Sequence, residues 1–98
     1  MTLHIQEIAW GIDRKNGGYK ERKTANEAFP CHVGKLPEFG RGGRNFAIDE
    51  VGEKHILLSV HYERNPAADK SWTLELGEEI GYTPRSFDGG YKYAFTLK

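Results

Sequence analysis

The sequence contains one cysteine, Cys31, among its 98 residues, and this scarcity restricts the class of protein. A single thiol cannot form an internal disulfide, whereas secreted domains of this size often carry several. No apolar run approaches the roughly 20 residues of a membrane-spanning helix. The stretch MTLHIQEIAW alternates polar and apolar residues and has no signal-peptide core. We therefore expect a soluble, cytoplasmic protein.

The sequence also lacks net charge, since 14 basic and 14 acidic side chains cancel. The two halves differ: residues 1–44 carry eight basic and five acidic side chains, whereas residues 45–98 carry six and nine. Nonspecific nucleic-acid binding depends on neutralising phosphates, so a net charge of zero argues against that function. A local basic patch remains compatible with it.

The sequence shows no sustained helical periodicity, and its apolar pattern indicates short strands. Twelve glycines and four prolines separate short runs rich in aromatic and β-branched residues, a spacing typical of β domains. The clearest run, YKYAFTLK, places Tyr91, Tyr93, Phe95 and Leu97 on one face. We predict a single mostly β domain over residues 1–98, an antiparallel barrel or sandwich. It would have about six or seven strands built from hairpins and at most one short helix.

Glycine pairs mark the expected turns. Asn16-Gly17-Gly18 and Asp88-Gly89-Gly90 both favour tight hairpin turns with positive φ. The apolar parity changes within the first strand, which predicts a bulge near Gln6–Glu7. Residues 24–38 leave open whether a helix forms, with Ala25–Phe29 as the candidate segment.

The stretch FGRGGRNF, residues 39–46, is the main candidate for function. Gly40, Gly42 and Gly43 let the backbone approach a ligand closely, and their amides could form a nest for an anion. Arg41 and Arg44 could bind phosphate or carboxylate in bidentate fashion. The hairpin-tip residues Arg14 and Lys15 could add to the positive electrostatic field of these two arginines. The alternative is a flexible connection whose arginines are only solvated.

The sequence gives only weak signals for nucleotide, nucleic-acid, metal or catalytic sites. The glycine loop lacks the ending of a P-loop and the βαβ setting of a dinucleotide fingerprint. Trp10, Trp72, Tyr82 and Tyr91 could stack bases, although we expect most of them in the core. No CxxC or HxH spacing indicates zinc, and we expect no cofactor. Catalysis through Cys31 or a histidine stays open as an alternative.

Parts of the chain resemble chagasin-type cysteine-protease inhibitors. GRGGRNF followed by VHYER is similar to that family's glycine loop and its later tyrosine–arginine strand, and LGEEIGYTPRSFDGG is similar to its opening strand. The order of these pieces is reversed here. Of the family's Asn-Pro-Thr-Thr-Gly loop only Asn65-Pro66 is present, and the Arg-Pro-aromatic element is missing. The likeness therefore indicates immunoglobulin-like β patterning and not membership of the family.

The functional expectation is a small intracellular binding module that is not an enzyme. It would bind a protein partner or a small anionic ligand through its Gly/Arg loops, as inhibitor or accessory proteins of phages and mobile elements do. The alternatives are a nucleotide- or RNA-binding β-barrel, a small enzyme, and a homodimer formed through the C-terminal hairpin.

Overall fold

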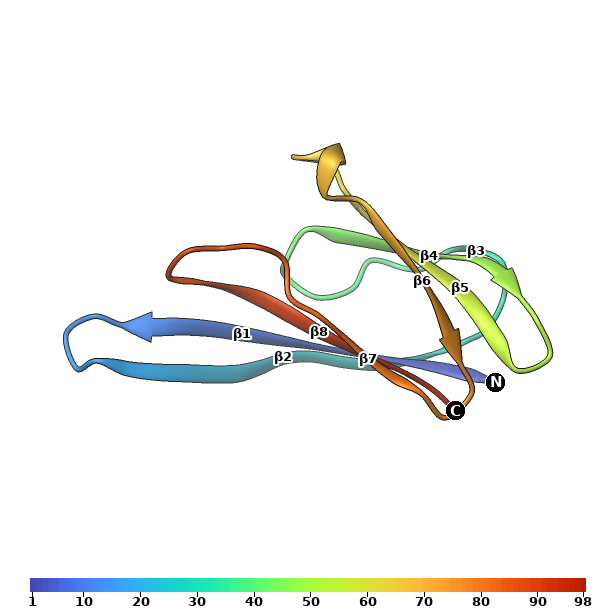
Figure 1. Cartoon of the computed structure of the whole chain (residues 1–98), viewed down its shortest axis with the longest axis horizontal. Coiled ribbons are helices and arrows are strands. Elements are labelled where there is room, and N and C mark those ends of the chain that lie inside the picture. The colour runs from blue at the N-terminus through green and yellow to red at the C-terminus, as the bar shows by residue number, and fades with distance from the viewer.

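The computed structural model describes residues 1–98 and has two antiparallel four-stranded sheets packed as a sandwich (Figure 1). One sheet has the order β2-β1-β8-β7 and the other the order β3-β4-β5-β6. The strands are β1 (Thr2–Asp13), β2 (Gly18–Pro30), β3 (Gly34–Lys35), β4 (Arg44–Val51), β5 (His55–Tyr62), β6 (Lys70–Glu75), β7 (Glu79–Tyr82) and β8 (Gly89–Leu97). The prediction of a mostly β sandwich is confirmed, whereas a closed barrel is not formed.

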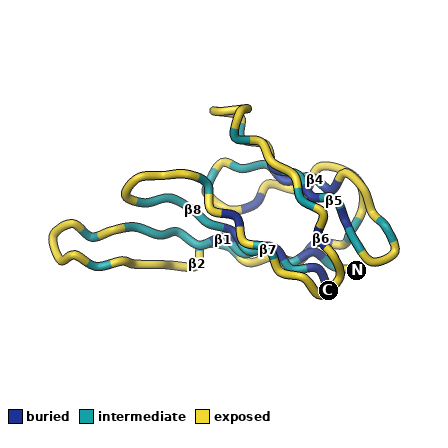
Figure 2. The backbone as a smooth tube through the Cα atoms, in the orientation of Figure 1, coloured by how far each residue is buried: buried dark blue, intermediate teal, exposed yellow.

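The core lies where the two sheets overlap. It consists of alternate apolar side chains from the central strands, among them Leu3 and Ile5 of β1, Leu58 of β5 and Phe95 of β8, each fully buried. Figure 2 shows the buried segments gathered in this overlap, near the two chain ends. The ends are joined by the hydrogen bond from Thr2 N to Lys98 O.

The β1–β2 hairpin is longer than the sandwich and extends away from it (Figure 1). The face of β1 that packs against the second sheet is buried at Leu3, Ile5 and Glu7. Beyond Glu7 the strand extends past the second sheet (Figure 1). Ile8, Trp10 and Ile12 then have the opposite parity and lie on the outer face. The register of β1 with β2 shifts between Glu7 and Ile8, so the predicted irregularity occurs there. The extra residue, however, is Thr24 of β2 and not a residue of β1.

Two local predictions were wrong. Ala25–Phe29 continues β2 and forms no helix, because these residues pair with Leu3–Glu7 of β1. Gly89 and Gly90 do not have positive φ; they begin β8, and residues 83–88 form a longer loop. Within the C-terminal hairpin β8 lies between β1 and β7, so β7 is the edge strand.

Other details follow the patterns more closely. Gly17 has a φ of 66° in the turn before β2, as the hairpin there requires. The segment RNPAADK forms one 3-10 turn, Pro66–Ala68, between β5 and β6. The structure contains no helix with the length and apolar character needed to cross a lipid bilayer.

Candidate functional site

The glycine loop is held by a buried carboxylate, that of Glu7 on β1. Its Oε1 accepts hydrogen bonds from the backbone N–H of Arg41 at 2.8 Å and from the Thr24 hydroxyl at 2.7 Å. Its Oε2 accepts from the backbone N–H of Gly42 at 3.1 Å and from the Tyr93 hydroxyl at 2.8 Å. The amides of Arg41 and Gly42 therefore hold an anion that is a side chain of the protein itself, and of the glycines predicted to bind a ligand anion only Gly42 takes part.

The loop can approach Glu7 because it carries glycines at the points of contact. Gly40 and Gly43 have φ values of 71° and 70°, a region that disfavours side chains. A Cβ atom on Gly40 would collide with the Glu7 carboxylate, and one on Gly42 would collide with the Tyr93 hydroxyl. The spacing of the glycines thus fits the loop to the carboxylate beneath it.

The charge on Glu7 is stabilised in spite of its burial. Desolvation alone would raise the pKa of this carboxyl group. The hydrogen bonds from Thr24, Arg41, Tyr93 and Gly42 favour the charged form and together lower the pKa below its usual value of 4.5. The pKa of Tyr93 is raised, because its hydroxyl is desolvated and donates to Glu7. The glycine loop therefore rests on an ionised carboxylate at neutral pH.

A polar cavity of about 530 Å³ opens beside this loop. Three segments that are distant in sequence line it: the glycine loop with the start of β4, the end of β5 with the residues that follow it, and the β7–β8 loop with the start of β8. Each segment contributes at least one arginine. The four are Arg41, Arg44, Arg64 and Arg85, and we refer to this space as the arginine cavity.

The positive charge in the arginine cavity is not neutralised within the chain. Glu63 is the one acidic residue in its lining. The protein has four ion pairs, namely Arg14–Asp88, His55–Glu50, His61–Asp69 and Lys92–Glu21, and none includes an arginine of the cavity. Guanidinium groups that share a cavity without carboxylate partners repel one another and attract anions.

Arg44 is the most firmly positioned of the four. Its guanidinium lies 3.6 Å from the centre of the Tyr62 ring, a cation–π contact with the end of β5. Its Nη1 donates a hydrogen bond of 2.8 Å to the carbonyl oxygen of Gly42. Arg41, Arg64 and Arg85 are exposed at the rim. The cavity thus combines one fixed guanidinium with three that can adapt to a ligand.

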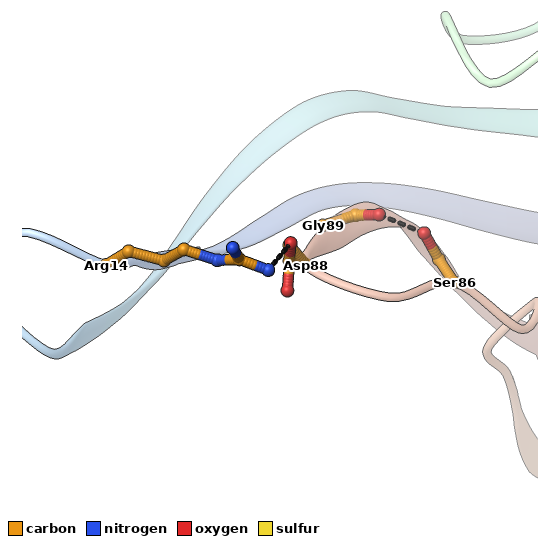
Figure 3. Close-up of polar contacts among 4 residues, drawn as sticks. All are labelled: Arg14, Ser86, Asp88 and Gly89. Carbon is orange, nitrogen blue, oxygen red and sulfur yellow. Dashed lines mark hydrogen bonds and ion pairs between the residues drawn. The ribbon is translucent and has the colours of Figure 1, made fainter.

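The structure separates the six predicted site residues into two groups. Arg41, Gly42, Gly43 and Arg44 line the arginine cavity. Arg14 and Lys15 lie in the turn between β1 and β2 and do not line it. Figure 3 shows Arg14 paired with Asp88, so this arginine ties the hairpin tip to the β7–β8 loop. In the same loop the Ser86 hydroxyl donates to the carbonyl oxygen of Gly89.

Sequence reasoning missed Glu7, Arg64 and Arg85. Glu7 breaks the apolar parity of Leu3 and Ile5, and an acidic residue at an expected core position is the one signal that could have identified it. Arg64 and Arg85 lie two and three residues beyond the ends of β5 and β7, in segments that read as ordinary loops. No local pattern indicates that these two loops meet.

The other candidates take mainly structural positions. Tyr82 is buried in the core, while Trp72 and Tyr91 pack against it. Trp10 and Tyr19 stack on the hairpin with ring centres 6.2 Å apart. Burial raises the pKa of the Cys31 thiol, the opposite of what a reactive thiolate needs.

Comparison with protein-family models, with curated proteins and with solved structures finds no match for this chain.

Proposed function

We propose that the protein is a binding module that is not an enzyme and that takes an anionic group, of a small ligand or of a protein partner, into the arginine cavity. One observation carries the proposal. Four arginines from three separate segments line a single cavity, and none of them has a carboxylate partner in the chain. Oxyanions pair with guanidinium groups in bidentate geometry, so phosphate and carboxylate are the groups that suit this lining.

The Glu7 contacts support the same proposal. The carboxylate occupies the loop amides of Arg41 and Gly42, so these amides are not the binding groups. Instead the carboxylate fixes the loop backbone, and the loop presents Arg41 and Arg44 to the cavity. A site whose backbone is held in place before binding loses less entropy when the ligand arrives. That the module acts as an inhibitor in a phage or mobile element stays a prediction.

Isothermal titration calorimetry with inorganic pyrophosphate tests the proposal. Arg64→Ala combined with Arg85→Ala removes two exposed guanidiniums from the cavity without touching the Glu7 contacts. Loss of charge-assisted hydrogen bonds predicts an affinity about ten-fold weaker or lower still. Arg41→Ala with Arg44→Ala would test the site less cleanly, because Arg44 also supports the loop.

The matched control removes the same charge elsewhere. Lys20→Ala combined with Arg22→Ala takes two exposed cations from the β1–β2 hairpin, outside the cavity, and leaves the Arg14–Asp88 pair intact. We expect this variant to bind pyrophosphate as the wild type does. Equal weakening in the two double variants would show that net charge, and not the cavity, governs binding. Absence of pyrophosphate binding in the wild type would contradict the proposal.

A further inference from the structure

The arginine cavity adjoins two more hollows, with which it shares lining residues. One, of about 500 Å³, lies across the glycine loop and shares Arg41, Gly43, Arg44 and Glu63 with the cavity. The other, of about 340 Å³, shares Arg44, Tyr62, Pro84 and Arg85 with it. Arg44 lines all three spaces. We call this row of three adjoining hollows the basic groove.

Cations run along the whole basic groove. Lys35 lines the hollow across the glycine loop, the four arginines line the central cavity, and Lys70 lines the third hollow. The groove has two acidic residues, Glu38 and Glu63. A single small anion would fill one hollow and leave the cations of the others unpaired. A chain of anionic groups could contact the groove from Lys35 to Lys70.

The aromatic side chains of the groove disfavour a nucleic-acid strand. Proteins that bind single strands stack bases on exposed aromatic faces. Here the Tyr62 ring is covered by Arg44, and Tyr82 and Phe39 are buried with exposures of 5% and 4%. Tyr62, with Arg44 on one face, and Tyr91 are both half-buried, so no aromatic ring of the groove is fully open. The zero net charge of the chain also gives no broad field for a phosphate backbone.

The β7–β8 loop also carries an exposed apolar group, which lies outside the three hollows. Phe87 is 94% exposed and stands two residues after Arg85. Aromatic residues and arginines are enriched among the residues that dominate the binding energy of protein interfaces. A protein partner offers an apolar surface that can cover this ring, whereas an isolated anion does not.

We infer that the basic groove binds an acidic segment of a protein partner, with carboxylates placed along the row from Lys35 through the arginine cavity to Lys70. The inference rests on the proposed function and specifies its ligand. Carboxylates match the bidentate geometry of guanidinium groups and need no stacking platform. The glycine loop, fixed on Glu7, forms the wall between the first two hollows.

Fluorescence anisotropy with two labelled probes tests this inference, with hexaglutamate as the acidic segment and an oligothymidylate of matched charge as the nucleic acid. We expect the wild type to bind hexaglutamate about ten-fold more tightly than the oligothymidylate. Lys35→Ala combined with Lys70→Ala should weaken hexaglutamate binding about five-fold, since each exposed charge contributes modestly. Pyrophosphate affinity should stay unchanged, because neither lysine lines the arginine cavity.

Lys15→Ala combined with Lys23→Ala is the matched control, since both lysines are exposed on the β1–β2 hairpin. Tighter binding of the oligothymidylate would overturn the inference in favour of nucleic acid and leave the proposed function standing. Pyrophosphate binding without tighter hexaglutamate binding, or without any effect of the groove lysines, would reduce the site to the central cavity. If neither pyrophosphate nor either polymer binds, the proposed function fails together with the inference.

Discussion

The carboxylate of Glu7 accepts a hydrogen bond from the backbone amide of Arg41 across 34 positions of sequence. This contact joins the first sheet to the loop that enters the second sheet. It also explains why an acidic residue lies fully buried among Leu3, Ile5 and their neighbours. The four donors around the carboxylate replace the water that burial removes.

The first prediction concerns the charge at this position. In Glu7→Gln one carboxylate oxygen becomes an NH₂ group, which faces donors and cannot accept their hydrogen bonds. The hydroxyl beside that NH₂ group can turn and accept from it, but the backbone N–H beside it is left without an acceptor, at a cost of about 1–3 kcal/mol in the free energy of unfolding. Urea denaturation measures this difference. Glu27→Gln, an exposed change on β2, should stay within about 0.5 kcal/mol of the wild type. Equal effects of the two substitutions would show that the Glu7 contacts contribute no stability.

The second prediction concerns acid. Because the pKa of Glu7 is lower in the folded protein than its usual 4.5, its stabilising effect is fully present above that pH. The effect declines as the pH falls below 4.5 and through the folded-state pKa. Wild-type stability should therefore fall more steeply on acidification than that of Glu7→Gln. Glu21 and Asp69, whose pKa values are also lowered, are present in both proteins and cancel in the comparison. Parallel pH profiles would contradict the assignment.

The third prediction separates backbone strain from close packing. Gly40→Ala places a side chain at a φ of 71° and against the Glu7 carboxylate. Gly17→Ala has a similar φ of 66° and open space around the new Cβ. The Gly17 variant should lose about 1 kcal/mol from the unfavourable φ alone. The Gly40 variant should lose about 1–3 kcal/mol more from overpacking. Thermal or urea denaturation of both variants checks this order, and equal losses would argue against a close fit between loop and carboxylate.

The fourth prediction concerns Phe87. Because 94% of this residue is exposed, Phe87→Ser removes almost no buried surface. We expect a change of at most about 0.5 kcal/mol in the free energy of unfolding. Phe46→Ala, in the core at 2% exposure, should cost about 3–5 kcal/mol. A loss for Phe87→Ser of the size expected for the core variant would mean that the ring packs against the protein and is not offered to a partner.

The β class and the main hairpins were predictable because alternation and turn glycines are local signals. Tyr93, Phe95 and Leu97 fall on one face by parity and are buried on it. The order of strands was not predictable, because β8 pairs with β1 from the other end of the chain. The local apolar pattern of Ala25–Phe29 was equally ambiguous, and only pairing with β1 makes this segment a strand.

The candidate site was predictable in part for the same reason. Glycines and arginines in FGRGGRNF predicted a loop that binds an anionic ligand, and what the structure shows is that two amides of this loop hold the internal Glu7 carboxylate. Arg64 and Arg85 join the loop through contacts between segments about 20 residues apart, which no local pattern encodes. Arg14 and Lys15 were grouped with the site because of their charge. They lie instead in the turn at the far end of the long β1–β2 hairpin.

The most direct test of the central claim is a titration of the isotope-labelled protein with inorganic phosphate, followed through its backbone amide resonances by NMR. The account predicts saturable shifts confined to the lining of the arginine cavity, at residues 41–44, 62–64, 85–86 and 90–91. The turn with Arg14 and Lys15 should show only the weak, unsaturated shifts of a general salt effect. Saturable shifts at that turn, or weak shifts spread over the whole protein, would contradict the claim that the arginine cavity is the anion site.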